Sequence, residues 1–124
     1  MDQSVKPLAW MGSSKDDLSA FPDDVRAIMG EALFQAQKGN EHRRAKALNG
    51  FGGRGVMEIV DDFDGDTYRA VYTVKFKGIV YALHAFQKKS KRGIETAKSD
   101  VDLVKQRLRA AEAHYAKWLR ENGI

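Results

Sequence analysis

The chain has 124 residues, of which 43% are hydrophobic and 31% charged, a composition typical of one folded domain over residues 1–124. It contains no cysteine, which excludes disulfides, thiolate nucleophiles and cysteine zinc sites. Its 21 Lys and Arg against 17 Asp and Glu give a formal charge of +4, which favours a nucleic acid or an acidic protein as partner. No apolar run approaches the ~18 residues that cross a bilayer, and the first residues lack a signal-peptide pattern, so we expect a cytoplasmic protein.

The N-terminal third of the chain is predicted to form a short strand and two helices. Residues 6–11 have the character of a strand, and Ser14 with Asp17 has the spacing of a capping box that opens a short helix. Pro22 suits the first position of a second helix, predicted over residues 22–38. The apolar residues of this second helix recur on one side: Val25, Ile28, Ala32, Leu33 and Ala36.

The middle of the chain is predicted to form an antiparallel β-meander. Asp64–Gly65 and Lys77–Gly78 each have the composition of a two-residue turn between strands. Apolar and polar residues alternate on either side of these turns, as strands require. The predicted order is a loop rich in glycine and basic residues, then three strands, over residues 39–55, 56–61, 67–76 and 79–86.

The last predicted element is a long helix from Ser99 to about Arg120. An apolar stripe at steps of three and four residues runs along it, and such a stripe packs on a core. The stripe consists of Val101, Val104, Leu108, Ala111, Tyr115 and Trp118. The fold class is therefore α+β, with two N-terminal helices, an antiparallel β-meander and a long C-terminal helix.

Side-chain alternation predicts a mixed face on the last two strands. A two-residue turn at Lys77–Gly78 sets Arg69 opposite Phe86. The side chains of His84 and Lys88 then project to the same side. Cations for phosphates and a ring for an unstacked base suit RNA, and we expect these groups to line an open groove. The opposite face is predicted to bury against the helices: Tyr68, Ala70, Tyr72, Val74, Phe76, Ile79, Tyr81 and Leu83.

Each of these residues also has a purely structural explanation. Arg69 could form a cross-strand ion pair with Glu58. His84 could be a histidine satisfied within the sheet, and Phe86 could be the edge of the core.

The three histidines fall in different predicted elements without metal-ligand spacing, so we expect neither a metal nor a cofactor. RNA can be cut without metal if side chains deprotonate its 2′-hydroxyl, stabilise the phosphorane and protonate the leaving oxygen.

Three segments of the sequence resemble the RelE/HigB-type toxins of bacterial type II toxin–antitoxin systems, and in particular their phage-derived branch. These segments are residues 54–59, 68–72 and 84–90. The last, in which one residue separates an aromatic side chain from two lysines, is the most specific. The resemblance implies a microbial-ribonuclease-like sheet with helices on one face. It also implies cleavage of mRNA on translating ribosomes and neutralisation by a small helix-turn-helix antitoxin.

Carried over by position, the resemblance implies that Arg69 contacts the scissile phosphate, with His84 or Lys88 as candidates for proton transfer. We expect the remaining cations and one ring to bind RNA: Arg43, Arg44, Lys46, Arg54, Phe86, Lys89, Lys91 and Arg92. Many members end in a strand or tail that supplies a further catalytic residue, whereas a long helix is predicted here. The alternative is therefore a non-catalytic or gyrase-targeting relative that acts by binding a protein. The nuclease interpretation expects Arg69→Ala to abolish growth arrest while the fold stays intact.

Overall fold

The fold is built on one mixed β-sheet. The computed structural model describes residues 4–53, 55–88 and 96–123, and within them the strand order is β1-β5-β4-β3-β2. β1 runs parallel to β5, and the other neighbouring strands are antiparallel. The elements in chain order are β1 (Leu8–Trp10), α1 (Ser14–Ser19), α2 (Asp23–Gln37), β2 (Ala45–Ala47), β3 (Val56–Phe63), β4 (Asp66–Thr73), β5 (Val80–Lys88) and α3 (Lys98–Asn122).

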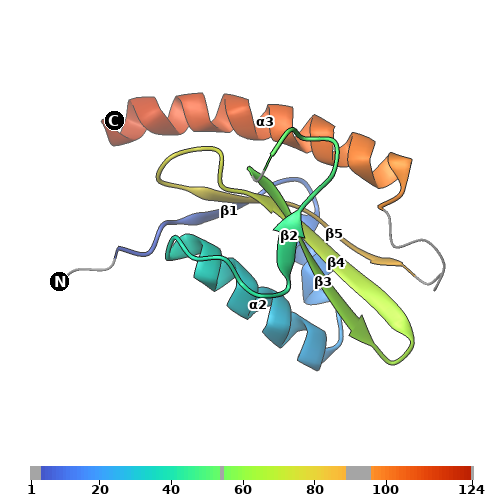
Figure 1. Cartoon of the computed structure of the whole chain (residues 1–124). Coiled ribbons are helices and arrows are strands. Elements are labelled where there is room, and N and C mark those ends of the chain that lie inside the picture. The colour runs from blue at the N-terminus through green and yellow to red at the C-terminus, as the bar shows by residue number, and fades with distance from the viewer. Residues whose placement is uncertain (1–3, 54, 89–95, 124) are drawn as a thin grey trace.

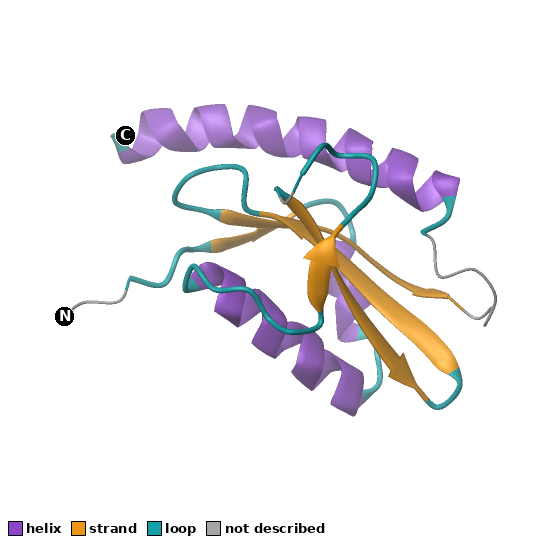
Figure 2. Ribbon diagram, viewed as in Figure 1, coloured by secondary structure: helices purple, strands orange, loops and turns teal. Residues whose placement is uncertain are grey.

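Helices cover both faces of this sheet. Figure 1 shows α2 against one face and α3 running along the other. In Figure 2 the strands form the middle layer between the two sets of helices. The predicted α+β class and the order of its elements are confirmed. The implied placement of all helices on one face is wrong, because the apolar stripe of α3 buries against the second face.

The two N-terminal helices begin close to their predicted residues. Ser13, rather than Ser14, is the N-cap of α1, and its hydroxyl donates to the Asp17 carboxylate at 2.7 Å. Ser14 is fully buried instead, and its hydroxyl donates to the Ala82 carbonyl at 3.2 Å, which fastens α1 to β5. In α2, Met29 is buried where the predicted stripe had placed Ile28.

The β3–β4 connection is the predicted two-residue turn. Asp64 and Gly65 have φ angles of 53° and 87°, the positive values that a tight hairpin turn needs at both central positions. Because this turn sets the register, Arg69 lies opposite Val60 and Glu58 lies opposite Val71. A short edge strand, β2, pairs with β3 inside the segment that was predicted to be a loop.

The β4–β5 connection differs from its prediction. The strands end at Thr73 and resume at Val80, so Lys77–Gly78 is not a two-residue hairpin. The pairing of Arg69 with Phe86 is nevertheless as predicted, because a β-bulge in β5, opposite Val71 and Tyr72, shifts the register by one residue.

The bulge also changes which face several side chains occupy. Tyr81 and Leu83 were predicted to face the N-terminal helices, but they are buried on the α3 side, where Ile79 also packs. Val74 was predicted to be buried and is 39% exposed. Burial raises the pKa of Tyr81 to about 12, with the nearby Tyr115 phenol adding to the effect, so its hydroxyl stays protonated at neutral pH beside His114.

Gly12 allows α3 to approach the turn between β1 and α1. Its φ is +55°, and a Cβ at this position would lie 2.6 Å from Nε of Arg107. Arg107 donates from Nη1 to the Leu83 carbonyl at 3.0 Å and from Nη2 to Ser13 Oγ at 3.1 Å. These two hydrogen bonds tie the middle of α3 to β5 and to the start of α1.

Replacing Gly12 with alanine is expected to lower the free energy of unfolding by about 2 kcal/mol, which urea denaturation measures. The left-handed backbone disfavours a side chain, and the new methyl group displaces the Arg107 guanidinium. Gly39→Ala is the matched control, since Gly39 has a φ of +87° and no described atom within 4 Å of its would-be Cβ. Equal losses in both variants would show that the Arg107 contact contributes nothing.

Candidate functional site

The site predicted from the sequence lies on the α3-facing side of the three long strands. Val71 of β4 is in register with Glu58 of β3 on one side and with His84 of β5 on the other. Arg69 is two residues from Val71 on the same strand and therefore projects to the same face. Glu58, Arg69 and His84, here called the Glu58–Arg69–His84 cluster, are thus neighbours on adjacent strands.

Glu58 and Arg69 form a buried ion pair. The distance from Arg69 Nη1 to Glu58 Oε2 is 3.1 Å, and the two side chains are only 4% and 2% exposed. The cross-strand pair considered from the sequence is therefore confirmed. Because a buried charge is costly unless it is paired, each of these two residues depends on the other.

Thr96, just before α3, closes over this pair. Its hydroxyl donates a hydrogen bond of 2.5 Å to Glu58 Oε2. The hydroxyl oxygen of Thr96 also accepts a hydrogen bond from Arg69 Nη1 at 3.5 Å, the outer limit of such a bond. The Glu58 carboxylate thus accepts a hydrogen bond from a hydroxyl and at the same time forms an ion pair with a guanidinium.

His84 is held from two sides. Its Nε2 donates to Asp100 Oδ1 at 2.8 Å, and Asp100 belongs to the first turn of α3. Its ring stacks on Phe86, with the ring centroids 4.6 Å apart. The ring is buried, and its Nδ1 has no hydrogen-bond partner within the described residues. Phe86 therefore packs against the imidazole, and its part in binding RNA stays a prediction.

The expectation of an open groove is wrong. Arg69 is 3% exposed and His84 is 7% exposed, because the N-terminal end of α3 and Thr96 lie over them. Lys88 is half-buried at the end of β5, opposite Thr67 and further along the same face. The predicted sharing of one face is confirmed, but the face is covered by protein.

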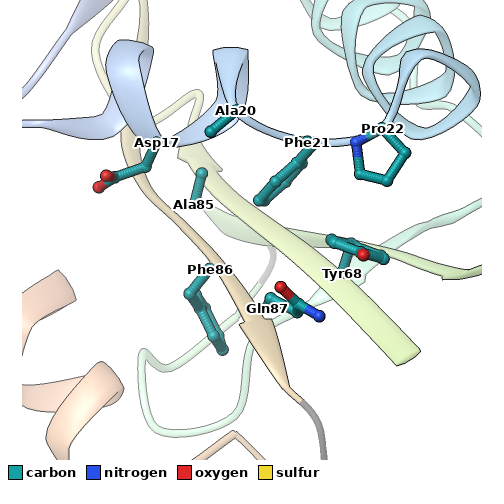
Figure 3. A pocket seen from close by; sticks show the side chains of 8 residues that line it. All are labelled: Asp17, Ala20, Phe21, Pro22, Tyr68, Ala85, Phe86 and Gln87. Carbon is teal, nitrogen blue, oxygen red and sulfur yellow. The ribbon is translucent and has the colours of Figure 1, made fainter.

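One hollow reaches the cluster, and a second lies beside the end of β5. A pocket of about 250 Å³ reaches Glu58 between β2 and α3 and is lined by Lys46, Ala47, Leu48, Asn49, Glu58, Thr96 and Val101. A more open hollow of about 470 Å³ lies between the α1–α2 corner and the end of β5, lined by Asp17, Ala20, Phe21, Pro22, Tyr68, Ala85, Phe86 and Gln87. Figure 3 shows Phe86 extending from the side of β5 opposite to Phe21, so most of this larger hollow lies away from the cluster.

The predicted RNA-binding cations are divided among different environments. Arg43 and Lys46 are exposed, and Lys46 lies opposite Glu58 at the mouth of the smaller pocket. Arg44 is engaged with Asp61, at 3.1 Å between Nη1 and Oδ1. Four predicted residues lie outside the described part of the chain: Arg54, Lys89, Lys91 and Arg92.

The sequence did not predict a functional role for three residues of this site. Glu58 was considered only as a partner of Arg69, although its place on the same face followed from the turn at Asp64–Gly65. Thr96 and Asp100 gave no comparable signal, because their contacts depend on how α3 docks.

No group of three or more His, Asp or Glu in the described ranges is arranged to hold a metal ion. None of the helices in these ranges has the length and apolar character to cross a bilayer.

The chain matches a known protein family over most of its length. The sequence model of the family described as "Phage derived protein Gp49-like (DUF891)" matches residues 16–109, a span that contains the whole cluster. No curated protein matches the chain in sequence. Among solved structures, the chain is similar to one in the crystal structure of the toxin–antitoxin complex RelBE2 from Mycobacterium tuberculosis. That similarity has 18% identity and a TM-score of 0.47, and it covers 72% of this chain and 98% of the other.

Proposed function

Because the chain belongs to the phage-derived Gp49-like family, we propose that it is the toxin of a type II toxin–antitoxin system that cuts mRNA on translating ribosomes. The family is the phage-derived branch that the sequence resemblance indicated. The proposed reaction is a metal-independent cleavage of the phosphodiester backbone. The proposed partners are the ribosome, mRNA and a small helix-turn-helix antitoxin.

The observation that carries the proposal is the Glu58–Arg69–His84 cluster. It combines a carboxylate, a guanidinium and an imidazole on three adjacent strands, joined to one another or to α3 by short contacts. A carboxylate can accept a proton, an imidazolium can donate one, and a guanidinium stabilises negative charge on a phosphate. These are the roles that RNA cleavage without a metal requires.

The contacts suggest which group performs each step. Glu58 already accepts a hydrogen bond from a hydroxyl, so it is the base that takes the proton of the ribose 2′-hydroxyl. The 2′-oxygen then attacks phosphorus, and Arg69 stabilises the added negative charge. The bond to the 5′-oxygen breaks, and that oxygen receives the Nε2 proton of the imidazolium form of His84, which becomes a neutral imidazole. The products are a 2′,3′-cyclic phosphate and a 5′-hydroxyl. Lys88 and the exposed Lys46 and Arg43 provide positive charge for neighbouring phosphates.

Inducing the chain alone in bacteria tests this function. We expect growth arrest, with new mRNA 5′ ends inside translated frames and none in a matched transcript that lacks a start codon. Co-expression of a small helix-turn-helix protein, where a neighbouring reading frame encodes one, is expected to restore growth. Intact mRNA together with a DNA-damage response would instead support the alternative, a gyrase-targeting relative that acts by binding a protein.

A further inference from the structure

The polar groups that close the Glu58–Arg69–His84 cluster resemble the substrate of the proposed reaction. Thr96 presents a hydroxyl to the carboxylate of Glu58, close to Arg69. Asp100 presents an oxyanion to Nε2 of His84. An RNA strand offers the same two groups, a ribose hydroxyl and a phosphate oxygen, within one nucleotide.

We infer that residues 96–100 are a built-in substrate mimic, which holds the site closed until an RNA phosphodiester backbone displaces it. This inference rests on the proposed function, because it concerns the regulation of the same cluster. The Thr96 hydroxyl stands in for the ribose 2′-hydroxyl, and the Asp100 carboxylate stands in for the phosphate. RNA and the segment therefore compete for the same hydrogen-bonding groups.

The way α3 is anchored allows its first turn to move by itself. The fully buried residues of this helix, Val104 and Ala111, lie further along it. Arg107 adds hydrogen bonds to β5 and α1 at the middle of the helix. Among residues 96–100, Thr96 and Asp100 form the hydrogen bonds to the cluster, while Lys98 and Ser99 are exposed. Fraying of one helical turn therefore uncovers the cluster without undocking α3.

Substitution of Asp100 by asparagine provides the test. The probe is a short fluorescent oligodeoxynucleotide, which has the phosphates but lacks the 2′-hydroxyl and is not cleaved by this route. We expect Asp100→Asn to bind it about tenfold more tightly than the unchanged protein, because the competing charged hydrogen bond is weakened. Fluorescence anisotropy at a fixed salt concentration measures the affinity.

Asp102→Asn is the matched control. Asp102 lies two residues further along the same turn and is exposed, and the hydrogen bond from Lys98 lowers its pKa, so it is ionised at neutral pH. Its replacement changes the net charge equally without touching His84, and we expect less than a twofold change in affinity. Thr96→Val removes the hydrogen bond to Glu58 and is expected to tighten binding of the oligonucleotide as well. This variant replaces Asp100→Asn in the test if Asp100→Asn does not fold.

The readout separates the two proposals. Equal affinities for the Asp100→Asn and Asp102→Asn variants, with no gain in Thr96→Val, would overturn the substrate mimic. Tighter binding in the Asp100 variant without any cleavage of RNA would support the mimic and contradict the nuclease. Tighter binding together with faster cleavage of RNA would support both.

Discussion

Replacing Glu58 with alanine is expected to lower the free energy of unfolding by about 3–5 kcal/mol. The substitution leaves Arg69, whose side chain is 4% exposed, without the carboxylate that lies 3.1 Å from its guanidinium. It also removes the acceptor of the Thr96 hydroxyl. Because a domain has roughly 5–15 kcal/mol of stability in total, a loss of this size removes a large part of it.

Urea denaturation measures this loss. Asp62→Ala, an exposed acid on the same strand, is the control and is expected to cost less than about 1 kcal/mol. Replacing both Glu58 with leucine and Arg69 with methionine is expected to recover much of the stability, since removal of a whole buried pair is often neutral. A loss below about 1 kcal/mol in Glu58→Ala would mean that water reaches the pair.

The same burial changes how the reaction is tested. Arg69→Ala was expected from the sequence to leave the fold intact, but it would leave the Glu58 carboxylate buried without its guanidinium. A loss of toxicity in that variant would therefore report on folding as much as on chemistry. His84 is the better choice, because the ring contacts Asp100 and Phe86 and takes no part in the Glu58–Arg69 pair.

His84→Gln is expected to reduce the rate of RNA cleavage by about 10²–10⁴-fold, the usual contribution of one general acid. The glutamine amide can still donate a hydrogen bond to Asp100, so the first turn of α3 keeps its contact. It cannot transfer a proton at neutral pH, so in the proposed reaction the 5′-oxygen would leave without one. Single-turnover cleavage of mRNA in a purified translation system measures the rate.

His114→Gln is the control for this substitution. His114 lies near the other end of α3, where its Nδ1 is 2.8 Å from the Tyr81 hydroxyl. Its replacement perturbs the helix–sheet contact but none of the groups of the cluster. We expect unchanged cleavage, with the fold of both variants monitored by thermal unfolding. Full activity in His84→Gln would remove the imidazole from the mechanism.

The shared face of the cluster could be predicted because it depends on local rules. Strand alternation and the two-residue turn at Asp64–Gly65 were sufficient to pair Arg69 with Glu58. The pairing of Arg69 with Phe86 was also predicted, although the two-residue turn from which it was derived is absent. The bulge in β5 restores the predicted register at these two residues. A bulge depends on packing against α3 as well as on the strand itself, so periodicity alone does not reveal it.

The closure of the site could not be predicted in the same way. The apolar stripe of α3 indicated that the helix packs on a core, but not which face of the sheet receives it. Packing on the second face follows from the aliphatic and aromatic side chains of Leu83, Tyr81 and Ile79, which the bulge turns toward α3. The short strand β2 was missed for a related reason, since three residues are too few for a period.

The parallel pairing of β1 with β5 has a consequence for synthesis of the chain. Leu8 is in register with Val80, so the first strand has no partner in the sheet until most of the polypeptide has been translated. Contacts this distant in sequence delay the completion of a fold. The groups that close the cluster come later still, at Thr96 and Asp100, so the nascent chain contains Glu58, Arg69 and His84 before it contains the segment that covers them.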